Sequence, residues 1–345
     1  MIILPHLLEK KKNIWRYADY FNPKIPEKFQ ISLNEGWTAH QKISIGDISA
    51  VIKREDQNPN GSHKDRNLAY HVSKAFMEAR KALVISSSGN AAISAAAYAK
   101  EAGIKLVAAV SPDTPKYKLN RLKSFEPIII LSKKAPRIAN FISARYKIEN
   151  LRPSLNDTAM EGYKSLALEI SEREERVDAI FCYAASGATV QALGGQMLEL
   201  FKKGLISYLP ELHVVQSGKI YSIVGGLTQI NIGETNAGYL GIKTTPRKES
   251  IIKTVKETGG TGWHITGDAI EKAQKILIGF GVNTSDEGWA VLAAMKQYLA
   301  KIPSKKVLGI MSGAVYIWED ISAETFSADT PEDIINLKLE QKIEI

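Results

Sequence analysis

Residues 58–66 read Asn58-Pro59-Asn60-Gly61-Ser62-His63-Lys64-Asp65-Arg66 and form a turn between a predicted strand and a predicted helix. Proline, asparagine and glycine interrupt regular structure here. Ile48 to Lys53 has strand character, and residues 64–79 carry apolar side chains at helical spacing. Lys64 therefore begins a helix, where the helix dipole favours anions over a charged lysine. The pattern indicates either a nucleophilic amine or an ordinary solvated lysine.

A second stretch has the same design. Ala82 to Ile85 is an apolar run typical of a buried strand, Ser86-Ser87-Ser88-Gly89-Asn90 follows it, and 91–102 is an alanine-rich helical segment. A strand, a small polar turn and a helix present backbone N–H groups to an anion. Strands and helices continue to alternate along the chain, which predicts an α/β fold with mostly parallel sheets.

These two stretches, NPNGSHKDR and SSSGNAAISAAAYAKEAG, resemble the fold-type II pyridoxal-phosphate enzymes, the tryptophan synthase β family. Trp15-Arg16-Tyr17 and Ser32-Leu33-Asn34-Glu35-Gly36-Trp37-Thr38 are similar to the threonine synthase branch. The resemblance implies two three-layer α/β/α domains, the smaller inserted in the larger. We expect residues 1–80 plus 150–345 to form the larger, cofactor-binding domain, with an N-terminal arm at 1–43, and residues 81–149 to form the smaller domain.

The resemblance also assigns roles to individual residues. Lys64 would attach covalently to the cofactor, pyridoxal 5'-phosphate, and then move protons as a base. Asn90 would contact the ring hydroxyl of the cofactor, and Ser312 its pyridine nitrogen. The cofactor phosphate would lie on the turn formed by Ser186, Gly187, Ala188 and Thr189, and the substrate carboxylate on Ser87, Ser88 and Asn90.

One segment departs from the family pattern. Residues 154–165 read SLNDTAMEGYKS, so that Ser154 and Asn156 match the family's substrate-binding segment while Ala159 replaces an arginine. An arginine is well suited to a phosphate dianion. Its loss leaves several possible substitutes for binding a phosphorylated substrate, namely Lys116, Lys118, Arg121, His40 and His63.

The resemblance implies a lyase that converts O-phosphohomoserine and water to threonine and phosphate. A first alternative is a pyridoxal-phosphate enzyme for β-elimination or β-replacement on serine, threonine or O-phosphoserine, which Ala159 favours. A second alternative is a catalytically silent relative that binds a ligand, which the presence of Lys64 disfavours. A homodimer is expected from the family.

The composition excludes several other classes of protein. The chain has 345 residues and a net charge of +8, with local basic excess at Lys116–Lys123 and Lys133–Arg137. No nucleic-acid motif accompanies this charge, so an anionic substrate explains it better. Six histidines and one cysteine, Cys182, show no metal-ligand spacing. Because no long apolar segment or secretory signal is present, we expect a cytoplasmic protein without a membrane span.

Overall fold

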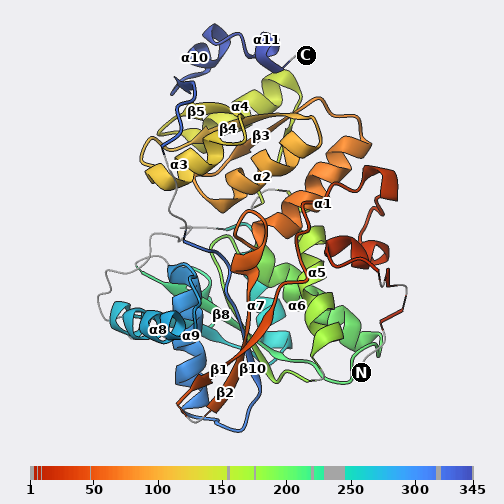
Figure 1. The fold of residues 1–345 in the computed structure, drawn as a ribbon, viewed down its shortest axis with the longest axis vertical. Coiled ribbons are helices and arrows are strands. Elements are labelled where there is room, and N and C mark those ends of the chain that lie inside the picture. Colours follow the sequence, from red (N-terminus) through yellow and green to blue (C-terminus); the bar gives the residue numbers. More distant parts are fainter. Residues whose placement is uncertain are drawn as a thin grey trace. The chain divides into compact units, whose positions relative to one another are not determined.

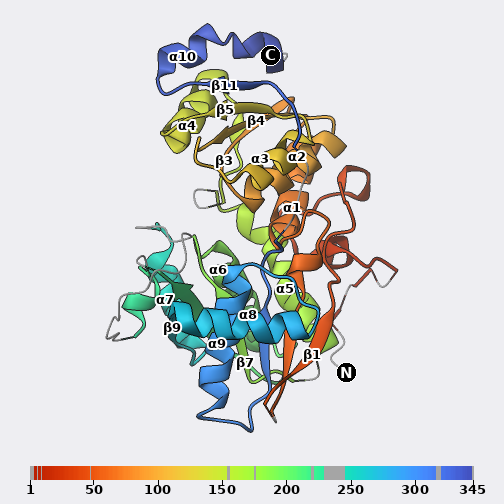
Figure 2. The ribbon, with the colours of Figure 1, turned by 60° about the vertical axis from the view of Figure 1, so that its left-hand side comes forward.

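The computed structural model describes residues 4–5, 7–8, 10–46, 48–153, 156–174, 176–218, 221–228, 245–315 and 320–343. The chain divides into two compact units (Figures 1 and 2). Unit 1 consists of Met1–Tyr20, Gly36–His63 and Tyr163–Val315. Unit 2 consists of Phe21–Glu35, Lys64–Gly162 and Tyr316–Ile345. The predicted smaller domain, residues 81–149, lies within unit 2, which also contains the helix after Lys64 and the C-terminal segment.

Unit 1 contains a six-stranded sheet in the order β1-β2-β10-β7-β8-β9. Only the β1–β2 pair is antiparallel; the other neighbours run parallel. Its strands are β1 (His40–Ile45), β2 (Ile48–Lys53), β7 (Ala179–Tyr183), β8 (Glu211–Ser217), β9 (Gly262–Ile265) and β10 (Val307–Ile310). Its helices are α5 (Ala159–Arg173, which begins in unit 2), α6 (Ala188–Lys202), α7 (Lys248–Glu257), α8 (Gly267–Gly279) and α9 (Asp286–Leu299). Helices α8 and α9 lie on one side of the sheet, and α5, α6 and α7 on the other (Figure 1).

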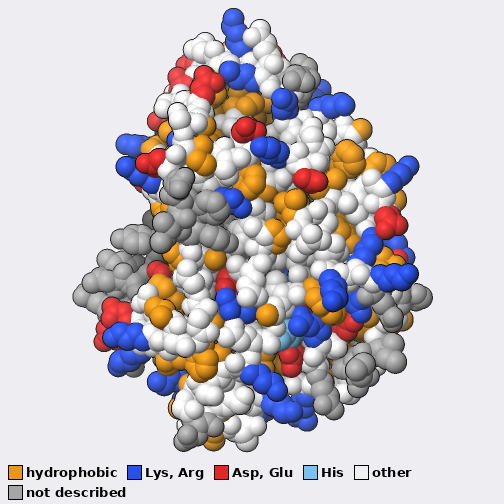
Figure 3. All heavy atoms as spheres, viewed as in Figure 1, with side chains coloured by type: hydrophobic (Ala, Val, Ile, Leu, Met, Phe, Trp, Pro, Cys, Tyr) orange, Lys and Arg blue, Asp and Glu red, His pale blue; other side chains and the backbone are white. Residues whose placement is uncertain are grey.

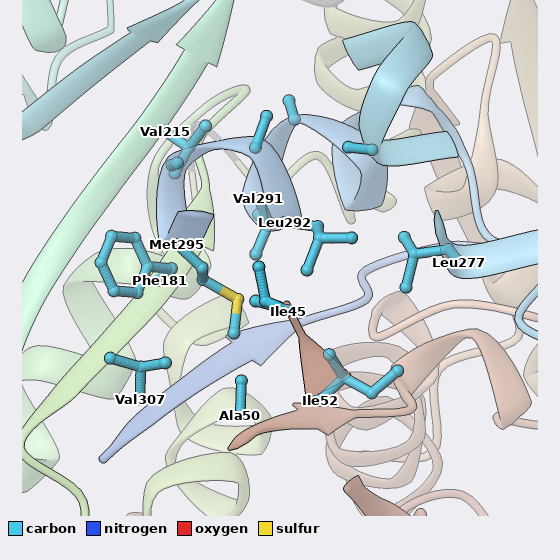
Figure 4. Close-up of a cluster of buried hydrophobic side chains, with 14 of the residues drawn as sticks. Ile45, Ala50, Ile52, Phe181, Val215, Leu277, Val291, Leu292, Met295 and Val307 are labelled. Atoms are coloured by element: carbon cyan, nitrogen blue, oxygen red, sulfur yellow. The ribbon is translucent and has the colours of Figure 1, made fainter. Parts of the chain in front are cut away.

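The core of unit 1 follows from the period-two pattern of its strands. Ile43, Ile45, Ala50 and Ile52 alternate with more exposed residues and pack on the same side of the sheet as α9. Figure 4 shows Ile45, Ala50 and Ile52 converging with Phe181 of β7, Leu277 of α8 and apolar residues of α9. The burial of these apolar side chains holds the strands in register and thereby sets the positions at which they end.

Unit 2 contains a five-stranded parallel sheet in the order β11-β5-β4-β3-β6. Its strands are β3 (Ala82–Ser86), β4 (Lys105–Val110), β5 (Ile128–Leu131), β6 (Glu149–Asn150) and β11 (Thr325–Ser327). Its helices are α1 (Lys64–Met77), α2 (Asn90–Glu101), α3 (Lys116–Lys123), α4 (Ala135–Tyr146), α10 (Pro331–Asn336) and α11 (Leu339–Ile343). Apolar residues of α4, α10 and α11 form one core with the sheet.

The α/β class and the mostly parallel sheets are confirmed. Strand β9 was not predicted, because its sequence, Gly262-Trp263-His264-Ile265, lacks a β-branched run. Strand β11 was not predicted either, because the three residues Thr325–Ser327 are too few to show a strand pattern. The C-terminal helices α10 and α11 are short, with Lys338 in a left-handed conformation between them.

Candidate active site

The turn between β7 and α6 is built to leave backbone N–H groups available. Helix α6 has no side-chain hydrogen bond at its N-cap, Gly187, whose φ of +81° suits glycine. A Cβ at Gly187 would lie 2.1 Å from Cδ1 of Ile251 on α7, so a larger residue here would force the Ile251 side chain to move. The carbonyls of this turn are already engaged: Gln216 Nε2 donates to Ala184 O at 2.9 Å, and Thr245 Oγ1 to Ser186 O at 3.0 Å. Peptide planarity directs the N–H groups of Ala185 and Gly187 the opposite way.

Ser312 lies at the neighbouring strand end. Strand β10 pairs with β7 in parallel, Gly309 opposite Phe181, so Ser312 and the 184–187 turn emerge at the same edge of the sheet. The chain order reverses here, because β8 and β9 follow β7 on one side while β10 lies on the other. Ligands of open α/β sheets bind at such a switch point, outside the carboxyl ends of the strands. The structure thus brings Ser186, Gly187, Ala188, Thr189 and Ser312 to one edge.

The turn before Lys64 is anchored to that same edge. Ser62 forms an isolated β-bridge with Gly313, Ala314 N donates to Gly61 O at 2.8 Å, and His63 N donates to Ser312 O at 3.1 Å. Lys64, the next residue in the chain, is the half-buried first residue of α1. Because Lys64 follows His63 in the chain, its backbone is held next to a residue that is hydrogen-bonded to Ser312.

A network of buried charged side chains is hydrogen-bonded to this turn through Asn58. Lys53 Nζ lies 2.5 Å from Glu169 Oε1 on α5 and 3.6 Å from Glu55 Oε1, and all three side chains are fully buried. Glu55 Oε2 accepts from Asn58 Nδ2 at 2.9 Å, and Asn58 O accepts from Gly61 N at 2.7 Å. Buried charges are tolerated only when paired in this way. The network was not predicted, although Lys53 and Glu55 at a strand end were a usable signal.

The Trp15-Arg16-Tyr17 motif of the arm has a structural place in unit 1. Arg16 pairs with Glu172 on α5, and Tyr17 Oη donates to the same carboxylate at 2.7 Å. The Arg16 guanidinium also lies 4.8 Å from the ring centre of Trp37. These contacts fix the arm on α5 and explain the motif without assigning it chemistry.

Unit 2 has a comparable turn after β3. Ser87, Ser88 and Asn90 lie at the carboxyl end of β3, between β4 and β6, which is the switch point of this sheet. Ser87 Oγ accepts from Gly89 N at 3.2 Å, and Ser88 Oγ from Ser111 N at 2.9 Å. Helix α2 has no side-chain hydrogen bond at its N-cap, Gly89, and no heavy atom lies within 4 Å of a Cβ built there. The turn is open and can accept an anion.

The residues predicted to bind the phosphate of the substrate belong to two separate segments, the start of α3 and residues 154–165. Lys116 and Lys118 begin α3, after β4, at the same edge of the unit 2 sheet as Ser88. Asn156 donates to Glu149 Oε1 at 3.0 Å and contacts His71 Nε2 at 3.1 Å, while its Oδ1 accepts from Thr158 N. Ser154 lies outside the described residues. Ala159 is fully buried at the start of α5.

Comparison with known proteins identifies the family. The model of the family described as pyridoxal-phosphate dependent enzymes matches residues 31–313. The chain belongs to this family. Its cofactor is pyridoxal phosphate, as the sequence predicted.

Similar proteins of this family include threonine synthases. That of Methanocaldococcus jannaschii is 25% identical over 293 residues, which cover 79% of this chain and 71% of that protein. That of Methanosarcina acetivorans is 25% identical over 322 residues, 86% of this chain and 76% of that protein. The crystal structure of serine racemase from Dictyostelium discoideum has a TM-score of 0.67 and 21% identity, and covers 81% of this chain and 93% of that chain. This likeness supports the fold alone.

The residues present fit the cofactor. A phosphate needs convergent N–H donors and no side chain in the way, which the Gly187 turn provides at the start of α6. A pyridine nitrogen needs a neutral hydrogen-bond partner, which the Ser312 hydroxyl can be. Lys64 is the amine that would hold the cofactor aldehyde. When bound, pyridoxal phosphate supplies the electron sink for charge that develops on an amino-acid substrate.

Neither a metal site nor a helix that could cross a membrane is found in the described residues. Among them, no group of three or more His, Cys, Asp or Glu side chains could hold a metal ion. Within that same part of the chain, every helix is too short or too polar to cross a membrane. Lys and Arg side chains are spread among acidic ones over the face shown in Figure 3 and form no single large patch there.

Proposed function

We propose that this pyridoxal-phosphate enzyme is a lyase that converts O-phosphohomoserine and water to threonine and phosphate. The observation that carries the proposal is the match to threonine synthases over 79% and 86% of the chain. The N-terminal arm supports it, because its Trp15-Arg16-Tyr17 motif resembles that of the threonine synthase branch.

Each proposed role uses chemistry available at the residue's position. The N–H groups at the start of α6 would hold the cofactor phosphate, and the Ser312 hydroxyl would orient the ring. The open α2 N-terminus, with Ser87 and Ser88, would hold the substrate carboxylate, since helix N-termini favour anions. The Lys64 amine would take and return protons at the substrate's carbon atoms. The charges of Lys116 and Lys118 would attract a phosphorylated substrate to unit 2.

The test is to incubate the cofactor-loaded protein with O-phosphohomoserine and measure phosphate and threonine together. We expect the two products in equal amounts. The Lys64→Ala variant is the control, and it should form neither product and lose the visible absorption of the bound cofactor. Phosphate release without threonine would exclude a threonine synthase.

A second candidate function is elimination or replacement on an unphosphorylated amino acid such as serine or threonine. It is favoured by Ala159, which is buried and apolar, and by Asn156, whose amide is already hydrogen-bonded to Glu149 and His71. Turnover of serine with no turnover of O-phosphohomoserine would select this function.

A further inference from the structure

His71 of α1 and Glu149 of β6 form a buried pair in unit 2 that has no role in the reaction proposed above. His71 Nε2 lies 2.8 Å from Glu149 Oε1, and the two side chains are 0% and 17% exposed. An ionised carboxylate only accepts hydrogen bonds, so Nε2 of the ring carries a hydrogen and donates it. Nδ1 of His71 has no hydrogen-bond partner within the described part of the chain. The ring is therefore held through Nε2.

Asn156 joins this pair, and we call the three residues the Glu149 cluster. Asn156 Nδ2 donates to Glu149 Oε1 at 3.0 Å and lies 3.1 Å from His71 Nε2. Asn156 Oδ1 accepts from Thr158 N at 2.9 Å, and Asn156 O accepts from Ala159 N at 3.2 Å. The backbone that enters α5 is thus folded around Asn156, whose side chain is bonded to β6 and contacts α1.

The segment that follows this cluster makes a second contact with α1. A Cβ built at Gly162 would lie 2.1 Å from Arg66 O, so the backbones of α5 and α1 touch there. Residues 156–162 therefore contact α1 at two points, one at His71 and one at Arg66. The second point is two residues from Lys64, the first residue of the helix. Residues 156–162 are the part of the predicted substrate-binding segment that lies in unit 2.

Glu149 also connects the cluster to the turn after β3. Strand β6 pairs with β3 in parallel, with Glu149 opposite Leu83. The carboxyl end of β3 leads into Ser87 and Ser88, which are predicted to bind the substrate carboxylate. One cluster thus joins three parts of unit 2 that are predicted to serve the substrate: the β3 turn, the start of α1 and residues 156–162.

We propose that His71 is a positioning residue, which holds residues 156–162 against α1 through Glu149 and Asn156. Asn156 is then the anchor of this segment rather than a direct ligand of the substrate. The inference rests on the proposed function, because that function makes residues 156–162 part of the substrate site.

The first test compares His71→Leu, which removes the donor, with His71→Gln, whose amide can still donate to Glu149. In the cofactor-loaded protein, KM for O-phosphohomoserine should rise about 10- to 100-fold in His71→Leu, as loss of a hydrogen bond to a charged group implies. The value of kcat should change little, because the segment contributes to binding. His71→Gln should return KM towards that of the wild type, since the lost Nδ1 has no partner among the described residues.

Hydrogen exchange measured by mass spectrometry examines the same segment without turnover. Backbone amides of residues 156–162 should exchange about 10-fold faster in His71→Leu than in the wild type. His213→Leu is the matched control, because His213 Nε2 lies 3.2 Å from Glu211 Oε2 and its side chain is 3% exposed, but this pair belongs to unit 1. The control should lower the melting temperature and leave both KM and the exchange of residues 156–162 unchanged.

Unchanged exchange of residues 156–162 in His71→Leu would overturn the inference, as would an equal rise of KM in His213→Leu. If melting scans show that His71→Leu does not fold, Asn156→Ala removes the other donor to Glu149 and should raise KM and exchange in the same way. Where both variants fold, the double variant should raise KM no further than either alone. Additive rises would show that the two residues do not act as one cluster and would overturn the inference.

Turnover and exchange together separate this inference from the proposed function. Wild type that forms threonine, with an unchanged KM in His71→Leu, would keep the function and refute the positioning role. Wild type that forms no threonine would refute the function, and the exchange of residues 156–162 would still decide whether His71 holds this segment.

Discussion

The turns after β7 and after β3 have the same strand–turn–helix construction but differ in how closely other side chains pack around them. Each follows a fully buried five-residue strand and ends in a glycine N-cap without a side-chain hydrogen bond. Gly187 has a positive φ, and a Cβ built there would clash with the Ile251 side chain. Gly89 has an extended conformation, and a Cβ built there would have no heavy atom within 4 Å. The first turn is enclosed by neighbouring side chains, and the second is open.

This difference matches two kinds of ligand. A cofactor phosphate has one size and stays bound, so an enclosed turn held by Gln216 and Thr245 suits it. An amino-acid carboxylate must enter and leave, so an open turn with serine hydroxyls suits it. The supports differ too, because the unit 1 edge rests on the Lys53 network, whereas Ser88 in unit 2 is held by a single backbone donor, Ser111 N.

The largest effect is expected from Lys53→Met, which removes the charge that supports the unit 1 edge. Because it leaves Glu169 and Glu55 buried without their lysine, the free energy of unfolding should fall by about 3–5 kcal/mol. Lys203→Met is the matched control, since Lys203 also lies 2.5 Å from its partner, Glu199, but is 62% exposed. Its loss should cost about 0.5 kcal/mol in denaturant titrations. Similar losses for both variants would show that the network is not a special support.

Gly187→Ala tests the enclosed turn directly. The added Cβ would meet Ile251 and strain the backbone, so unfolding free energy should fall by about 2–4 kcal/mol and cofactor affinity should fall with it. Gly204→Ala is the control, because Gly204 has a φ of +67° but no heavy atom within 4 Å of a Cβ. It should show the backbone strain alone. Titration of the apoprotein with pyridoxal phosphate gives the affinity.

Glu35 provides a pH test of unit 2. Burial raises its pKa to about 7, with Asp65 adding to the effect, while backbone N–H groups and Tyr98 oppose it. The folded state then binds more protons than the unfolded state between about pH 4.5 and 7. Stability should therefore fall by about 3 kcal/mol as pH rises through this range and stay level above it. Glu35→Gln should remove this fall in unfolding measured against pH, and an unchanged profile would contradict the assignment.

Glu149 should give a dependence of stability on pH that is opposite to that of Glu35 in the same unfolding measurements. Burial raises its pKa, but the hydrogen bond and charge of His71 outweigh burial and hold it at about 2. Its contribution to stability is present above about pH 4.5 and is lost as pH falls toward 2. Glu149→Gln should reduce that loss in unfolding measured at acid pH, and an unchanged loss would contradict the assignment.

The smallest effect on stability is expected from Gly89→Ala in the open turn. Nothing lies within 4 Å of the new Cβ, so unfolding free energy should change by about 1 kcal/mol or less. The methyl group would nevertheless occupy space beside the α2 N-terminus, so the amino-acid substrate's KM should rise while cofactor affinity is retained. A large stability loss would show that this turn is as enclosed as that at Gly187.

The sequence by itself determined the α/β class, the order of most strands and helices, the family and its cofactor. It did so because apolar periodicity and turn residues are local, and because Lys64 and Gly187 belong to motifs that are contiguous in the chain. Strand β9 and the two-residue β6 were beyond this reasoning, since short strands form by pairing with neighbours rather than by their own propensity.

Only the tertiary structure decided how distant residues support the site. Lys53 and Glu169 are separated by 116 residues, and His63 and Ser312 by 249. No local pattern specifies such pairs, because sheet order and helix packing bring them together. Physically, a buried charge requires a partner at hydrogen-bond distance, and the partner's identity depends on which strand ends share an edge.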